Sequence, residues 1–115
     1  MAELKIPPLD LMFFMMETPA SPKHVGALQV FKLPRRAPKN FLRDLVAAYR
    51  EAPVAPPFNY RPQFPRTGMP YWEPVQEQDM DFHVRHSALP APGSDEQLQE
   101  TAARLHAGLL ERDRP

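Results

Sequence analysis

Proline is the residue that most constrains the fold of this chain. The sequence contains 16 prolines among 115 residues, nearly three times the average share of about 5%. Because proline fixes φ and has no backbone N–H, it limits both long helices and central strands. We therefore expect regular structure between the proline clusters. Seven prolines fall within residues 53–74, so we expect that segment to be a long loop without a regular element.

The composition indicates one small folded unit rather than a disordered chain. Hydrophobic residues make up 43% of the sequence and aromatic residues 10%, which is enough for a modest core. Fourteen Lys or Arg residues balance fourteen Asp or Glu residues, so the chain has no overall attraction to nucleic acid. It contains no cysteine, which excludes disulfides and thiolate zinc sites and is typical of a reducing cytoplasm.

Three segments have the apolar spacing of helices. The first is predicted from Asp10, a capping residue, to about residue 18, before Pro19. The second is predicted over residues 38–52, because Pro38 suits a first helical turn and an apolar stripe follows it. The third begins at Ser94, which has a glutamine three residues later, the spacing of a capping box.

Two further segments favour strands. Residues 25–33 carry apolar side chains on both faces, and residues 82–89 alternate between two faces. The resulting order is helix, strand, helix, long loop, strand and helix, which is typical of an α/β or α+β domain. Because two strands form only a marginal sheet by themselves, the sequence predicts few strands with about three helices.

The histidines and serines of the chain give no complete catalytic or metal site. His83 and His86 lie three residues apart on a predicted strand, so they point to opposite faces. They are interpreted as structural or surface histidines, with metal binding as the alternative. No two histidines are adjacent, and no serine lies in a nucleophile-elbow motif. We therefore predict neither a catalytic residue nor a metal ligand within these 115 residues.

Two short surface candidates remain open. Residues 11–16 form the longest apolar run, which is far too short to span a bilayer. They are interpreted as core, with binding of acyl chains or a membrane surface as the alternative. Arg35 and Arg36, with Lys32 and Lys39 nearby, form a basic cluster. It is interpreted as a solvated loop, with contact to a phosphate or an anionic lipid as the alternative.

A set of short motifs runs along nearly the whole chain. They are Pro8-Leu9-Asp10 with Phe13 and Glu17, His24-Val25-Gly26, residues 41–46, Pro56-Pro57-Phe58, residues 81–86 with Leu89-Pro90, and Leu105-His106 through Arg114-Pro115. In order and spacing they resemble the amino-terminal part of the bacterial wax ester synthase/diacylglycerol acyltransferase family. The chain departs from that family's pattern over residues 60–70.

The resemblance implies a chloramphenicol-acetyltransferase-like fold of two domains, of which residues 1–115 would be an incomplete amino-terminal domain. It implies transfer of a fatty acyl group from acyl-coenzyme A to diacylglycerol or a long-chain alcohol, without a cofactor. The family's catalytic base is a histidine in a His-His-x-x-x-Asp-Gly motif, and no such motif occurs in this sequence. The remainder of an acyltransferase chain would therefore be a partner of this one.

The resemblance also implies where substrate would bind. The candidate residues are Asp10, Phe13, Phe14, Glu17, His24 and Gly26. The expected location is cytoplasmic, with peripheral contact to the inner membrane or to lipid droplets as a further expectation. The alternative is a stand-alone module that binds lipid or a protein partner without catalysis.

Overall fold

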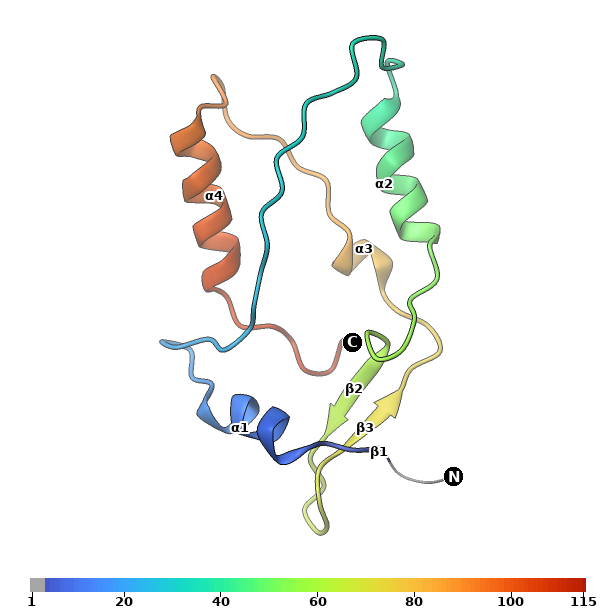
Figure 1. Cartoon of the computed structure of the whole chain (residues 1–115), viewed down its shortest axis with the longest axis vertical. Helices are drawn as coiled ribbons and strands as arrows, with labels where there is room; N and C mark the ends of the chain where they lie inside the picture. The colour runs from blue at the N-terminus through green and yellow to red at the C-terminus, as the bar shows by residue number, and fades with distance from the viewer. Residues whose placement is uncertain (1–3) are drawn as a thin grey trace.

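The structure, a computed structural model, describes residues 4–115 and has mixed α/β architecture (Figure 1). Within those residues it contains four helices, α1 (Pro8–Met16), α2 (Phe41–Glu51), α3 (Met80–His83) and α4 (Asp95–Ala107), and three short strands, β1 (Leu4–Lys5), β2 (Tyr60–Gln63) and β3 (Tyr71–Pro74). The three helices predicted from apolar spacing are found as α1, α2 and α4. The predicted fold class, with few strands, is confirmed.

Helix α1 begins at Pro8, three residues before the start that a cap at Asp10 implies. Pro8 occupies its first position after Pro7, and no side chain caps it. Proline suits the start of a helix because the N–H that it lacks would be unpaired there anyway. The prediction of Asp10 as the cap is therefore wrong. Asp10 lies in the first turn instead, where its carboxylate faces the positive end of the helix dipole.

Helix α4 has the predicted capping box. The hydroxyl of Ser94 accepts a hydrogen bond from the Gln97 backbone N–H at 3.2 Å, and the Gln97 side chain accepts one from the Ser94 N–H at 2.8 Å. Two donors that a helix would leave unpaired are thus satisfied. Helix α2 begins at Phe41 rather than at Pro38, because Pro38 lies in a turn that ends where the Phe41 N–H meets the Pro38 carbonyl.

The proline-rich segment contains a β-hairpin, so the expectation of no regular element there is wrong. Strands β2 and β3 are antiparallel and β1 pairs with the other side of β3, which gives the order β1-β3-β2. Pro62 is tolerated because β2 is an edge strand. Arg61 lies opposite Glu73 and donates to its carboxylate at 2.6 Å. This contact, followed by one from the Gln63 amide, lowers the pKa of Glu73.

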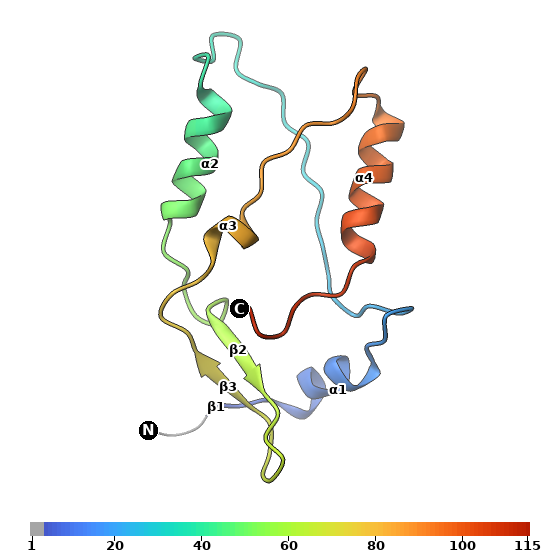
Figure 2. The same ribbon diagram turned by 180° about the vertical axis from the view of Figure 1, so that it is seen from behind.

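Both predicted strands are wrong as regular elements. Residues 25–33 are extended but pair with no strand among residues 4–115, and residues 82–83 belong to helix α3. A strand needs a neighbour for its backbone groups, and the described chain supplies none here. Val25 is 95% exposed and Phe31 84% exposed. Residues 25–33 and the segment that joins α3 to α4 both run between α2 and α4 in the two opposite views (Figures 1 and 2).

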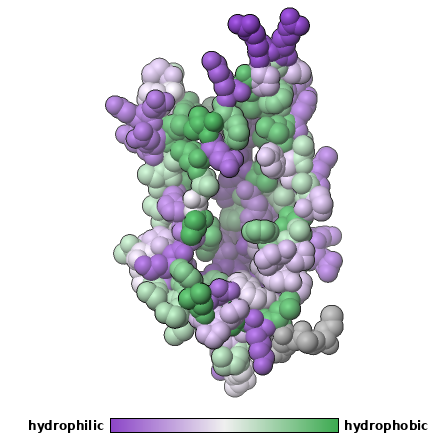
Figure 3. Space-filling model, in the orientation of Figure 1, coloured by the Kyte–Doolittle hydropathy of each residue, from purple (hydrophilic) through white to green (hydrophobic). Residues whose placement is uncertain are grey.

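The molecule is an open frame with very little core. Its radius of gyration is 17.8 Å and its extents are 55 × 32 × 18 Å, whereas a compact domain of 100 residues has a radius of about 13 Å. Ile6 is the one buried apolar side chain among residues 4–115, at 6% exposure. Figure 3 shows the hollowed middle of one face, with hydrophobic side chains beside it. No helix within the described residues has the length and apolar character that crossing a bilayer requires.

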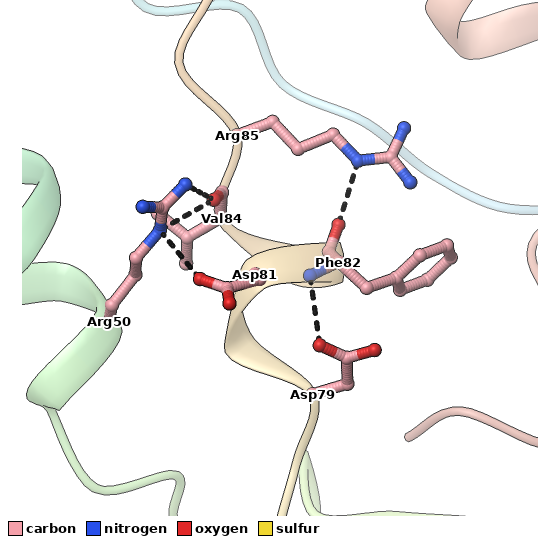
Figure 4. Close-up of polar contacts among 6 residues, drawn as sticks. All are labelled: Arg50, Asp79, Asp81, Phe82, Val84 and Arg85. Atoms are coloured by element: carbon pink, nitrogen blue, oxygen red, sulfur yellow. Dashed lines mark hydrogen bonds and ion pairs between the residues drawn. The ribbon is translucent and has the colours of Figure 1, made fainter.

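Arg50 joins α2 to α3 (Figure 4). Its Nε and Nη2 donate to the Val84 carbonyl at 3.1 and 3.0 Å, and Nε lies 3.6 Å from the Asp81 carboxylate. Asp79 caps α3 by accepting from the Phe82 N–H at 3.2 Å. This cap starts a helical turn that includes the first two residues of the predicted strand.

Candidate functional site

A cavity of about 280 Å³ lies where the end of α1, strand β2 and the carboxy-terminal segment meet. Its walls are Phe13, Phe14, Glu17, Lys23, His24, Tyr60, Pro62, Leu110, Glu111, Arg112, Arg114 and Pro115. Four of the six predicted substrate-binding residues are brought together here, namely Phe13, Phe14, Glu17 and His24. Apolar side chains and a set of charged groups therefore share one cavity.

The carboxylate of Glu17 is held in place from two directions. It accepts a hydrogen bond from the Lys23 backbone N–H at 3.1 Å and another from Arg112 Nη2 at 3.4 Å. The side chain is only 12% exposed. The Lys23 bond, ahead of the bond and charge of Arg112, lowers the pKa of Glu17. Glu17 is therefore an anion near neutral pH, already occupied by donors and poorly suited to act as a base.

A tight turn brings Lys23 back to Glu17. Thr18 and Ser21 exchange backbone hydrogen bonds at 3.2 and 2.9 Å, and the Lys23 ammonium donates to the Ser21 hydroxyl at 2.9 Å. Pro19 lies within this turn and Pro22 follows it directly, and each proline fixes φ at its position. The residues that end α1 thus also place the Lys23 N–H against the Glu17 carboxylate at the edge of the cavity.

Arg112 ties the carboxy-terminal segment to α1 and the hairpin. Its Nη2 donates to the Phe14 carbonyl at 2.9 Å, and its guanidinium lies 5.0 Å from the Phe14 ring centre and 5.6 Å from that of Phe64. Phe14 also packs edge-on against Phe64, with ring centres 5.5 Å apart, and lies 5.7 Å from Trp72. A cation over aromatic faces is attracted by their negative quadrupole, so this cluster fixes one wall of the cavity.

His24 lies between the cavity and α4. Its Nε2 is 2.7 Å from the backbone carbonyl oxygen of His106, and the two imidazole rings pack edge-on at 4.6 Å. Because a carbonyl oxygen only accepts, Nε2 carries the proton and Nδ1 of a neutral ring is an acceptor. This Nδ1 is buried and has no hydrogen-bond partner among the described residues. His24 is thus a positioned ring that docks one segment on another.

Gly26 lets the chain pass closely beside α4. A Cβ built on Gly26 would lie 2.9 Å from His106 Nδ1, so a larger residue would displace that ring. Gly26 also borders a second hollow, of about 580 Å³, between residues 24–28 and α4. Asp10, in contrast, is exposed and lines neither hollow. The structure therefore leaves Asp10 apart from the other predicted site residues.

Sequence reasoning missed Arg112, Lys23 and Tyr60 as cavity residues. Lys23 contributes through its backbone N–H, which no side-chain pattern indicates, and Arg112 lies 95 residues from its carboxylate partner. No group of three His, Cys, Asp or Glu residues able to hold a metal ion is found within residues 4–115. The described cavity can hold and orient a ligand through its apolar wall and charged groups.

Comparison with known proteins identifies the class. The family described as the wax ester synthase/diacylglycerol acyltransferase catalytic domain matches residues 6–115. The chain therefore belongs to that family, and the resemblance noted in the sequence is confirmed.

Individual relatives agree with this family. The chain is 41% identical over 111 residues to a Mycobacterium tuberculosis protein named probable diacylglycerol O-acyltransferase Tgs4, a match that covers 96% of this chain and 23% of that protein. It is 39% identical to O-acyltransferase WSD of Acinetobacter baylyi, covering 94% of this chain and 23% of the relative. The chain thus spans about a quarter of the length of these relatives, in their amino-terminal part.

A solved structure has the same backbone arrangement. The wax ester synthase/diacylglycerol acyltransferase from Marinobacter aquaeolei superposes with a TM-score of 0.87 and 35% sequence identity, over 99% of this chain and 28% of that one. The open frame of the present chain is therefore a shape that also occurs within a much longer acyltransferase.

Proposed function

We propose that this chain acts as the amino-terminal part of an O-acyltransferase that moves a fatty acyl group from acyl-coenzyme A to diacylglycerol or a long-chain alcohol. The observation that carries the proposal is the superposition of 99% of the chain on the Marinobacter enzyme, together with the family match over residues 6–115. The products would be triacylglycerol or wax esters, and no cofactor takes part.

The reaction requires a base that these 115 residues do not offer. In the proposed scheme, the histidine of a His-His-x-x-x-Asp-Gly motif, supplied by the remainder of an acyltransferase chain, removes the proton of the acceptor hydroxyl. The oxygen bonds to the acyl carbon and the thioester C–S bond breaks. The leaving thiolate of coenzyme A then takes the proton. The present chain binds and orients substrate.

The cavity at the end of α1 is the proposed contribution of this chain to substrate binding. Phe13 and Phe14 offer apolar surface to an acyl chain. The ionised Glu17 keeps the turn and Arg112 in place beside them. His24 and Gly26 set the path of the following segment along α4. Asp10 stays a candidate whose contribution would come from the exposed first turn of α1.

The proposed location is the cytoplasm, at a lipid surface, because diacylglycerol and long-chain alcohols are confined to membranes or lipid droplets. The alternative function is a stand-alone module that binds lipid or a protein partner. The exposed apolar face of α1 favours it, since Leu9 is 67%, Met12 53% and Met16 57% exposed. An exposed apolar patch is a common mark of an interaction site. The two functions differ in whether the chain supports turnover.

A chimera tests the proposal. In it, this chain replaces the matching 28% of the Marinobacter enzyme, and ester formation from a long-chain acyl-coenzyme A and a long-chain alcohol is measured. Turnover supports the proposal. A chimera that melts cooperatively and elutes as a single species, yet forms no ester, contradicts it and favours the binding module.

The chimera also tests the binding residues. Phe13→Ala is expected to raise KM for long acyl chains about tenfold and to affect short chains less, because one apolar contact of about 1.4 kcal/mol is lost. Phe58→Ala is the matched control, since Phe58 is 78% exposed and lines no part of the cavity. Equal effects of the two substitutions would argue against Phe13 as a binding residue.

A further inference from the structure

Charge is unevenly distributed along this neutral chain. Residues 18–43 contain six of the fourteen Lys and Arg residues and no Asp or Glu. Most of these cations gather in residues 31–43, which we call the basic tip. Its cations are Lys32, Arg35, Arg36, Lys39 and Arg43. Although the net charge of the whole chain is zero, residues 31–43 are strongly positive.

Two consecutive turns build the basic tip. The Ala37 N–H donates to the Pro34 carbonyl and the Phe41 N–H donates to the Pro38 carbonyl, each at 3.0 Å. Arg35 and Arg36 are the central residues of the first turn, and Lys39 is a central residue of the second. The tip lies at one end of the longest axis and runs into the first turn of α2, and hydrophilic side chains project from that end (Figures 1 and 3).

The cations of the first part of the tip have no acidic partner. Arg43 lies 3.6 Å from Asp44, but no ion pair within residues 4–115 includes Lys32, Arg35, Arg36 or Lys39, and all four are exposed. Burying an unpaired cation is costly. Whatever packs against the open frame, these side chains must face either water or an anionic partner.

Apolar side chains flank the cations. Phe31 is 84%, Leu33 53% and Leu42 45% exposed. A projecting loop with both cations and apolar groups matches a membrane interface, where phosphates meet the charges and the apolar groups enter the acyl boundary. A nucleic acid would instead favour a charged stripe or groove with stacking platforms. We propose that the basic tip docks on an anionic lipid surface, an inference that extends the location given under the proposed function.

A polarity-sensitive dye tests where contact occurs. Because the chain has no cysteine, Asn40→Cys in the tip and Thr67→Cys in the β2–β3 turn each provide one attachment site. These sites lie toward opposite ends of the longest axis (Figure 1). The dye at position 40 is expected to brighten and shift to the blue on phosphatidylglycerol-containing vesicles and not on phosphatidylcholine vesicles. The dye at position 67 is expected to stay unchanged. The two turns of the basic tip are each closed by a backbone hydrogen bond between residues three positions apart. The dye at position 40 therefore reports on the surroundings of the tip itself.

Paired arginine substitutions test the charge. Arg35→Gln/Arg36→Gln is expected to weaken partitioning onto the anionic vesicles about 30-fold, since each cation near such a surface contributes about 1 kcal/mol. Arg66→Gln/Arg104→Gln removes the same charge away from the tip and is expected to change partitioning less than about threefold, because distant charges are screened. Flotation of the chimera with the same substitutions gives a second measurement.

Each other outcome overturns the inference. Equal responses of the two dyes, or equal binding to phosphatidylcholine, would mean that the exposed apolar frame adsorbs without using the tip. Equal losses from both arginine pairs would mean that net charge alone matters. A response to an RNA duplex but not to vesicles would assign the tip to nucleic acid. The vesicles contain no substrate, and ester formation is measured in detergent, so failure of docking and failure of acyl transfer are separate results.

Discussion

The carboxylate of Glu17 and the guanidinium of Arg112 lie 3.4 Å apart although 95 residues separate them along the sequence. Because Arg112 also donates to the Phe14 carbonyl, this one side chain fastens the carboxy-terminal segment to the end of α1. In a frame with so little core, such contacts determine the shape of the candidate cavity more than apolar burial does.

Removing the Arg112 guanidinium should weaken the attachment of the carboxy-terminal segment to α1. Arg112→Gln in the chimera is expected to lower the free energy of unfolding by about 1 kcal/mol, since hydrogen bonds of a charged group are lost but the guanidinium is partly exposed. Arg104→Gln is the control, because Arg104 is exposed and belongs to none of the ion pairs of the described chain. Denaturant unfolding compares the two, and equal losses would contradict the account.

The contribution of Glu17 should depend on pH. Its pKa is lowered from the ordinary value of 4.5, chiefly by the Lys23 N–H. A carboxyl whose pKa is lower in the folded than in the unfolded chain stabilises the fold above the ordinary value, and this stabilisation is lost as pH falls through the folded value. The advantage of the parent chimera over its Glu17→Gln variant should therefore be full at about pH 7 and shrink below pH 4.5.

Thermal melts at several pH values measure this advantage. Glu100→Gln is the control, since Glu100 is exposed and its carboxylate accepts no hydrogen bond from another side chain within residues 4–115. A difference between the parent and Glu17→Gln that stays constant down to acid pH would show that the Glu17 charge is not what stabilises the turn.

We predict that position 26 requires glycine, because a side chain there would collide with the His106 ring. Gly26→Ala in the chimera is expected to destabilise by about 1–3 kcal/mol, because the added Cβ meets the His106 ring at 2.9 Å. Gly108→Ala adds the same atom where the nearest neighbour is 3.9 Å away, so little change is expected. His106→Ala combined with Gly26→Ala should recover part of the loss. No recovery would mean that the clash is not the cause.

The capping box of α4 should contribute measurably. Ser94→Ala removes the acceptor for the Gln97 N–H and is expected to cost about 1 kcal/mol. Ser94→Gly should cost only a few tenths, since glycine is tolerated at this position. Urea unfolding of the two chimeras ranks them, and the reverse order would contradict the assignment of Ser94 as the cap.

Local signals predicted the helices of this chain, and their failure for the strands has a physical cause. Helices α1, α2 and α4 pair their own backbone groups, so apolar spacing and the Ser94 cap were sufficient. The expected strands need neighbours, and residues 25–33 find none in the described chain. The β2–β3 hairpin was missed because Pro62 and Pro74 lie in its strands, and proline argues against a strand. The opposite charges of Arg61 and Glu73, which face each other across the hairpin, are typical of cross-strand pairs.

Some residues of the candidate site could be grouped from the sequence and others could not. Phe13, Phe14 and Glu17 lie on or beside one helix that the sequence predicted, so they could be grouped in advance. Arg112 could not, because its approach to Glu17 depends on how the distant segment returns to α1. Asp10 was grouped with them by motif, but it lies in the first turn of α1 and does not line the cavity.

Ester formation measured side by side for the chimera and for this chain alone tests the central claim most directly. With the same acyl-coenzyme A and alcohol, we predict turnover by the chimera and none by the chain alone, because these 115 residues contain no His-His-x-x-x-Asp-Gly base. Turnover by the chain alone that is lost in His83→Ala or His86→Ala, or a folded chimera without activity, would contradict the account.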